Sequence, residues 1–134
     1  MAVTTATIPE SDEQHPEHSM PESLVLIIMT GGTICMQRSP SGLIPARGFQ
    51  ESCLARVPTF NDGSNPPPLE VVVNAAGDRK SYQSLRTPPS AYDRQVRDTV
   101  FEFEELLDSS SIDAKGWAEI ARTIYWNYTL FDAF

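Results

Sequence analysis

Apolar residues gather into three short segments that predict β-strands. Leu24–Met29 is a continuous apolar run, typical of a strand covered on both faces, as in a parallel α/β sheet. Leu69–Asn74 is a second run with a high content of strand-forming residues. In Thr99–Glu104 the kind of side chain alternates with a period of two residues. This pattern predicts a strand with Phe101 on one face and Val100 on the other. The pattern therefore indicates an α/β protein.

The last part of the chain predicts one amphipathic helix. Its apolar positions recur at i, i+3, i+4, i+7, i+8 and i+11, and they are Trp117, Ile120, Ala121, Ile124, Tyr125 and Tyr128. Ser111 or Asp113 can cap the start of this helix. The apolar residues that follow, Leu130–Phe134, indicate the beginning of a further strand.

Polar stretches separate these elements. Residues 1–22 lack apolar periodicity and carry several acidic side chains, so we expect a disordered acidic tail. Gln37–Phe49 is punctuated by glycine and proline, which predicts a hairpin or a mobile loop. Residues 61–94 are mostly polar and rich in proline, and we expect a polar insertion there. The folded part is therefore expected to span residues 23–134.

Length and charge narrow the choice of function. The 134 residues suit one small domain or part of a larger one. A formal net charge of -8 provides no basic surface, so we expect neither a nucleic acid nor an anionic membrane as partner. The first residues lack a basic start followed by an apolar stretch, so we expect no secretory signal. The longest apolar run is far shorter than the ~20 residues that span a bilayer. We expect a soluble, cytoplasmic protein.

The scarcity of histidine limits the possible chemistry. His15 and His18 both lie in the predicted tail, which excludes a Ser-His-Asp or Cys-His mechanism unless the tail folds back. Acidic residues do not cluster in a ligand pattern, and Cys35 and Cys53 are isolated thiols, so we expect no metal and no organic cofactor. A nucleophile would therefore be a hydroxyl group activated by something other than histidine.

The first predicted strand ends in Gly31 and Gly32, with Thr30 before them and Thr33 after them. Glycines allow a sharp turn and a close approach to a ligand, and free N–H groups at such a turn can bind an anion or a developing oxyanion. Ligands of open α/β sheets bind at this end of the strands. The alternative is an ordinary tight turn, with threonines favoured as strand residues.

A second candidate segment, Asp108–Ser111, lies between the alternating strand and the predicted helix. Serine hydroxyls and helical N–H groups could hold a ligand's carboxylate, while Asp108 could hold its ammonium group. The alternative is ordinary capping of the helix.

Together these segments resemble known active-site motifs. Met29–Ile34 after an apolar strand resembles the first active-site motif of bacterial-type L-asparaginases, and Phe103–Ser110 resembles the second motif in their cytosolic (type I) branch. The resemblance covers Leu24–Phe49 and Val100–Phe134, with the two motifs in the right order. It implies a flavodoxin-like three-layer (α/β/α) architecture, present here as an incomplete asparaginase N-terminal domain.

The resemblance also implies roles for five residues. Thr33 would be the nucleophile that attacks the side-chain amide of L-asparagine, with Gly32 at the amide oxygen. Asp108, Ser109 and Ser110 would bind the α-amino and α-carboxylate groups of the substrate. The reaction would release ammonia and aspartate through an acyl-enzyme, without a cofactor, and the full-length form would be a homo-oligomer.

Two departures from the family pattern leave other hypotheses open. Leu43 stands in a loop where many bacterial members carry a tyrosine that assists the nucleophile. The family's next motif, a Gly-Thr-Asp run, and its supporting lysine are expected after Phe134, so we expect a truncated chain that is inactive alone. Alternatively, the chain is a non-catalytic fragment that binds an amino acid or a full-length paralogue, or it is a nucleotide- or phosphate-binding α/β domain.

Overall fold

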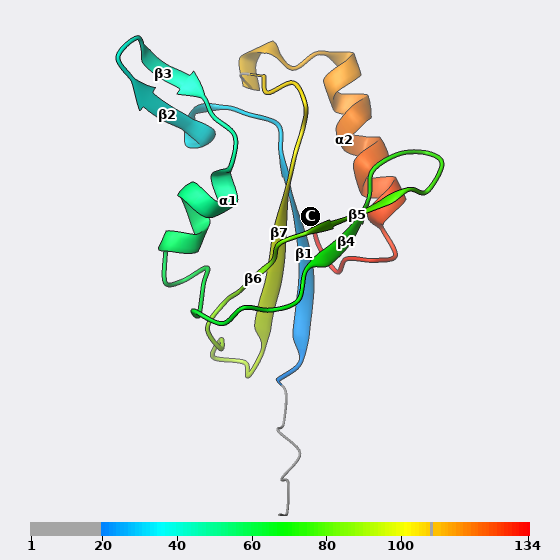
Figure 1. Ribbon diagram of the computed structural model, residues 1–134. Helices are drawn as coiled ribbons and strands as arrows, with labels where there is room; N and C mark the ends of the chain where they lie inside the picture. The colour runs from blue at the N-terminus through cyan, green and yellow to red at the C-terminus, as the bar shows by residue number, and fades with distance from the viewer. Residues whose placement is uncertain (1–19, 108) are drawn as a thin grey trace, which may run out of the picture.

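A three-stranded sheet forms the centre of the molecule (Figure 1). The computed structural model describes residues 20–107 and 109–134. The strand order is β1 (Glu22–Met29), β7 (Gln95–Glu102) and β6 (Leu85–Arg86). β1 and β7 are parallel, whereas β6 runs antiparallel to β7. The predicted α/β class is confirmed. β1 contains the predicted strand Leu24–Met29, whereas β7 overlaps the predicted strand Thr99–Glu104 at Thr99–Glu102 only and begins four residues earlier, at Gln95.

Both faces of this sheet are buried. The first core consists of Leu26, Leu69, Val71 and Phe131. The second core consists of Met29, Leu54, Leu85 and Val100. Neighbouring residues of β1 contribute to different cores, as do Val100 and Phe101 of β7. This arrangement explains the continuous apolar run of β1, because a strand covered on both sides has no face left for polar residues.

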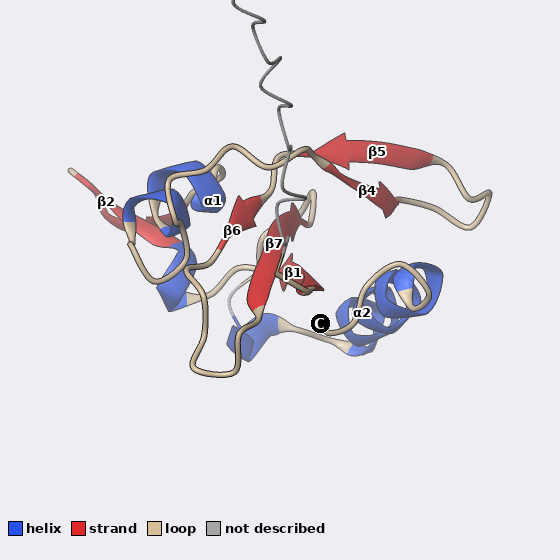
Figure 2. Ribbon diagram, turned by 90° about the horizontal axis from the view of Figure 1, so that it is seen from below, coloured by secondary structure: helices blue, strands red, loops and turns tan. Residues whose placement is uncertain are grey.

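Different elements cover the two faces. On the side of the first core lie the antiparallel hairpin of β4 (Leu69–Val72) and β5 (Arg79–Tyr82) and the helix α2 (Ala114–Asn127). On the side of the second core lie the short helix α1 (Phe49–Ser52) and the 3-10 turn η2 (Leu54–Arg56). Figure 2 shows α1 on one side of the central strands and α2 on the other.

The stretch at residues 61–94 contributes to both cores. Val71 of β4 is fully buried in the first core, and Leu85 of β6 lies in the second. The part before β4 contains neither helix nor strand, as its Asn-Gly-Pro composition predicts. That the stretch is an insertion relative to the family stays a prediction; structurally it is integral to the fold.

The predicted tail, residues 1–22, lies mostly outside the described residues, and so do His15 and His18. Its predicted end is wrong by one residue, because Glu22 begins β1. Glu22 joins the sheet because its carboxylate pairs with Arg86 (2.5 Å) and with Arg97 (3.3 Å). These two ion pairs connect the start of β1 to β6 and β7.

The predicted hairpin after the glycine turn is confirmed. β2 (Met36–Ser39) pairs with β3 (Gly42–Pro45) in an antiparallel ladder that projects from the body of the molecule (Figure 1). All four residues of β3 are exposed. Gln37 Nε2 donates a hydrogen bond to Ser52 Oγ (3.2 Å), which connects the hairpin to α1.

The predicted helix is confirmed, but the prediction of which helix face is buried is wrong. Asp113 caps α2, and its Oδ1 accepts a hydrogen bond from Gly116 N at 3.0 Å. Three aromatic residues of the predicted apolar stripe are largely exposed, namely Trp117 (64%), Tyr125 (80%) and Tyr128 (72%). The fully or nearly fully buried residues of the helix are instead Thr123 and Asn127.

Asn127 explains this orientation of α2. Its Oδ1 accepts a hydrogen bond from Val72 N (2.8 Å), and its Nδ2 donates to Val72 O (2.9 Å). Nδ2 also donates to Thr123 O (2.9 Å). A buried polar side chain that satisfies both backbone groups of a strand residue fixes which helix face meets β4.

The last residues return to the central sheet, as predicted. Ala133 forms a parallel bridge with Val25 on the edge of β1 opposite to β7. Leu26 N donates to Ala133 O (3.1 Å), and Asp132 N donates to Leu24 O (2.8 Å). Asp132 and Ala133 therefore pair with the edge of β1 that β7 does not occupy.

Candidate active site

The turn after β1 depends on two glycines. Gly31 and Gly32 have φ angles of 115° and 96°, in the region that disfavours residues with a Cβ. Gly32 precedes the 3-10 turn η1 (Thr33–Cys35), and its carbonyl accepts a hydrogen bond from Cys35 N at 3.0 Å. These angles allow the chain to leave the sheet sharply and to place Thr33 on the surface.

The two predicted motif segments are in direct contact. β1 and β7 end side by side, with Met29 opposite Glu102. Beyond the strands, Phe103 N donates to Met29 O (3.0 Å), and Leu107 N donates to Thr30 O (2.8 Å). The backbone of Gly31 passes so close to Leu107 that an added Cβ would lie 2.2 Å from the Leu107 carbonyl oxygen. The fold therefore joins two segments far apart in sequence at one edge of the sheet.

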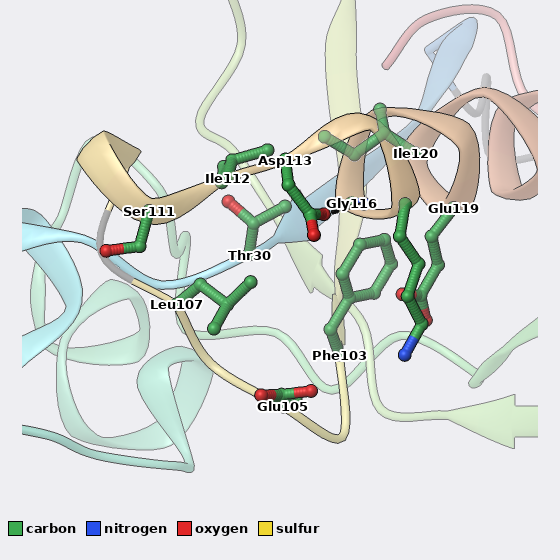
Figure 3. Close-up of a pocket in the computed structure, with 11 residues that line it drawn as sticks. Thr30, Phe103, Glu105, Leu107, Ser111, Ile112, Asp113, Gly116, Glu119 and Ile120 are labelled. Carbon is green, nitrogen blue, oxygen red and sulfur yellow. Dashed lines mark hydrogen bonds between the residues drawn. The ribbon is translucent and has the colours of Figure 1, made fainter.

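A cavity of about 310 Å³ lies between this junction and the start of α2 (Figure 3). Apolar lining residues are Phe103, Leu107, Ile112 and Ile120, and polar ones include Thr30, Glu105, Ser111, Asp113, Lys115 and Glu119. Three carboxylates and one ammonium group give the lining an acidic balance at neutral pH. Such a site can bind a small molecule that carries an amino group.

The predicted site residues are distributed unevenly around this cavity. Thr30 lines it, whereas Thr33 is exposed and is not among the lining residues. Gly32 is buried within the turn. Of the two threonines that flank the glycines, Thr30 therefore lines this cavity, and the role of Thr33 stays a prediction.

The second predicted segment is only partly described. Asp108 lies outside the described residues. Ser109 and Ser110 form the 3-10 turn η3 (Ser109–Ser111), directly before the cap of α2. Ser111, at the end of η3, lines the cavity. The substrate-binding roles of Asp108, Ser109 and Ser110 stay predictions.

Several cavity residues are not indicated as site residues by the sequence motifs. Lys115 and Glu119 belong to neither motif segment, and both line the cavity, with Lys115 also exposed to solvent. They are four residues apart, so they lie on one face of the helix, and this spacing is the sequence feature that could have indicated them. Glu105 gives no signal of its own, because its position depends on how the chain turns after β7.

Both cysteines are free thiols, as expected. Partial burial raises the pKa of the Cys35 thiol, and the nearby Cys53 and the Glu102 carboxylate raise it further. Cys35 follows Thr33 by two residues and packs against the second core. It is therefore a structural thiol, poorly ionised at neutral pH.

Two further properties follow from the described part of the chain. Across residues 20–107 and 109–134, His, Cys, Asp and Glu side chains form no group of three or more that could hold a metal ion. Within the same residues, no helix has the length and apolar character needed to cross a membrane.

Comparisons with known proteins show the family of this chain. The family described as Asparaginase, N-terminal matches residues 24–134. The 60 kDa lysophospholipases of Mus musculus and Homo sapiens are each 32% identical over 114 residues, covering 85% of this chain and 18% of their own length. L-asparaginase 1 of Escherichia coli (strain K12) is 28% identical over 115 residues, covering 86% of this chain and 25% of its own. The chain thus spans between 18% and 25% of the length of these relatives. It belongs to the asparaginase family through a match to the N-terminal domain.

Proposed function

We propose that this chain supplies the nucleophile-bearing part of an L-asparaginase-type amidohydrolase. Thr33 Oγ attacks the side-chain amide carbon of L-asparagine, and the amide nitrogen leaves as ammonia after taking up a proton. A water molecule then breaks the resulting ester, which releases L-aspartate and restores the hydroxyl. In this proposal the domain is a flavodoxin-like three-layer unit, and no metal or organic cofactor takes part.

The contact between the two motif segments carries the proposal. Gly31 and Leu107 touch where two parallel strands end, and this edge is where α/β sheets bind ligands. A nucleophile from one segment and substrate-binding groups from the other require such a junction. A turn that served only to reverse the chain would not need the second segment at van der Waals distance.

The remaining residues have proposed roles in binding. The backbone of Gly32 lies at the amide oxygen, where N–H groups stabilise the developing negative charge. Asp108 binds the α-ammonium group, and Ser109 and Ser110 bind the α-carboxylate. In this proposal the group that activates the Thr33 hydroxyl comes from outside residues 20–107 and 109–134. A homo-oligomer of a longer chain is one source of such a partner.

An ammonia-release assay tests the proposal. Purified residues 1–134 are compared with a version extended by the sequence encoded in frame after Phe134, both with L-asparagine. We expect no turnover by residues 1–134, because the family's second threonine, aspartate and lysine are absent from them. We expect turnover by the extended version that Thr33→Ala abolishes. Asparagine binding without ammonia release would instead support the non-catalytic hypothesis.

The similarity to 60 kDa lysophospholipases supports a second candidate, hydrolysis of a lysophospholipid ester. The same hydroxyl could attack an ester carbonyl, since both reactions transfer an acyl group to the nucleophile. Release of fatty acid from a lysophospholipid, measured on the same two preparations, distinguishes the candidates. Fatty acid release without ammonia release would favour the second one.

A further inference from the structure

The hairpin β2–β3 is attached to the sheet at both of its ends, and the two attachments lie close together. Its first end leaves β1 after Met29, through the glycine turn and Thr33. Its second end returns at Gly48, directly before α1. Glu102, the last residue of β7 and the register partner of Met29, contacts this second end.

Glu102 holds the returning chain through its carboxylate. Its Oε1 accepts hydrogen bonds from Gly48 N (2.8 Å) and from Phe49 N (2.9 Å). Its side chain is 18% exposed, and its Oε2 lies 3.9 Å from Arg47 Nη1. Backbone amides bonded to an ionised carboxylate are among the stronger hydrogen bonds in proteins, the more so with water largely excluded.

The hairpin has few other side-chain contacts with the body. Its strand β3 is exposed throughout, and its own polar contacts, such as Ser39 Oγ with Gly42 O, lie within the hairpin. Gly48 has a φ of 77°, so the residue that Glu102 holds has a left-handed backbone conformation that glycine adopts without strain. A segment fixed at a glycine and exposed beyond it can move about that point.

We propose that Glu102 is a positioning residue that keeps the β2–β3 hairpin beside the Thr33 turn. The carboxylate connects three parts of the candidate active site: it ends β7, which leads into the second motif segment; it lies opposite the end of β1; and it fixes the hairpin that follows Thr33. The catalytic meaning of this connection rests on the proposed function. The hydrogen bonds of Glu102 with Gly48 and Phe49 are present whether or not the chain has that function.

Limited proteolysis of the chain 1–134 tests the proposal without any catalysis. Trypsin can cleave after Arg38, an exposed residue of β2, and the rate of that one cleavage is followed by mass spectrometry. For Glu102→Ala we expect cleavage at least about tenfold faster than for the unmodified chain, since the hairpin opens more often without its two amide contacts. For Glu102→Gln we expect a rate close to that of the unmodified chain, because the amide oxygen accepts the same two hydrogen bonds.

Glu104→Ala is the matched control. Arg47 contacts Glu104 through the backbone carbonyl, so removing this exposed carboxylate should leave the hairpin in place. Equal cleavage rates for Glu102→Ala and the unmodified chain would overturn the proposal, as would Glu102→Gln being cleaved as fast as Glu102→Ala. Absence of asparagine hydrolysis would count against the proposed function and leave this proposal intact.

Hydrogen exchange of the unmodified chain provides a test that does not depend on any variant folding. We expect the amide protons of Gly48 and Phe49 to exchange at least about tenfold more slowly than in an unstructured chain, because both are bound to Glu102. Exchange of these two protons at the unstructured rate would overturn the proposal.

Discussion

Gly31 and Leu107 approach each other so closely that only a residue without a side chain fits between the two segments that they belong to. A Cβ on Gly31 would lie 2.2 Å from the Leu107 carbonyl oxygen and 2.8 Å from its nitrogen. The φ of 115° excludes most residues at Gly31 independently. By contrast, a Cβ on Gly32 would meet no atom within 4 Å, although its φ is also positive.

Replacing these two glycines by alanine should therefore have different effects. Gly31→Ala should lower the free energy of unfolding by about 2–4 kcal/mol, since it adds a backbone clash to the cost of the positive φ. Gly32→Ala should cost only about 1–2 kcal/mol, from the backbone angle alone. Urea unfolding followed by circular dichroism measures both. Equal losses would mean that the Leu107 segment moves aside freely.

Thr33 and Thr30 should differ in any chain that hydrolyses L-asparagine. Thr33→Ala removes the proposed nucleophile and should leave no measurable covalent turnover, so kcat falls by several orders of magnitude. Thr30→Ala removes one hydroxyl from the cavity lining and should cost less. Steady-state ammonia release measures both. Normal turnover by Thr33→Ala would exclude the proposed nucleophile.

Asp108 should select substrates that carry an α-amino group. Asp108→Ala should raise KM for L-asparagine by roughly 10- to 150-fold, which corresponds to a charge-assisted contact of roughly 1.5–3 kcal/mol. Succinamic acid, which is asparagine without the amino group, is the control substrate, and its KM should not change. An unchanged KM for asparagine would leave the Asp108 segment with a capping role only.

Asp98 should make the protein less stable as the pH rises. This β7 residue is 3% exposed, and its Oδ1 has no hydrogen-bond partner among the described residues. Burial raises the pKa of its carboxyl group from 3.8 to about 6. At a pH between these two pKa values, the carboxyl group of Asp98 has lost its proton in the unfolded chain and keeps it in the folded chain. The contribution of Asp98 is therefore fully present below about pH 4 and declines until about pH 6.

The size of this decline follows from the shift of about two pKa units, which amounts to up to about 3 kcal/mol. Urea unfolding at pH 4, 5, 6 and 7 measures the decline, with Asp98→Asn as the variant. The amide cannot ionise, so the variant should lose this part of the pH dependence. A variant whose stability changes with pH as much as that of the unmodified chain would show that Asp98 is not the source.

Asn127 should contribute strongly to the attachment of α2. Asn127→Ala leaves both backbone groups of Val72 without their side-chain partner in a buried place, and it should destabilise the fold by about 2–4 kcal/mol. Tyr128→Ala is the control, because Tyr128 is exposed, and it should change stability by less than about 0.5 kcal/mol. Thermal unfolding distinguishes the two. A loss for Tyr128→Ala as large as for Asn127→Ala would mean that another molecule covers the exposed helix face.

The strands and the helix could be predicted because their local patterns agree with their environment. β1 is apolar throughout since it is covered on both faces, and Asp113 caps α2 as its position before the helix suggests. The turn at Gly31 could be located from its glycines and from the end of the apolar run. The resemblance of the two segments to asparaginase motifs also indicates that they belong to one site, and their contact at Leu107 agrees with it.

Contacts made by buried polar side chains could not be predicted. Asn127 determines which face of α2 packs inward, although the apolar stripe indicates another face. Gln50 is buried because its amide donates to Gln83 O and accepts from Val100 N. Glu102 likewise binds backbone amides of a segment distant in sequence. Each of these polar residues has backbone partners that only the folded chain brings near, so the sequence contains no local signal for them.

The bridge between Val25 and Ala133 also fixes the register of any strand that continues from Ala133 beside β1. Parallel strands advance together by about 3.3 Å for each residue. Since Met29 follows Val25 by four positions, a strand that continues from Ala133 in this register would reach the level of Met29 after four residues. A fifth residue would lie beside Thr30, which lines the cavity. A photo-crosslinking group at Thr30 would test whether a strand, from the same polypeptide or from a second one, occupies this position.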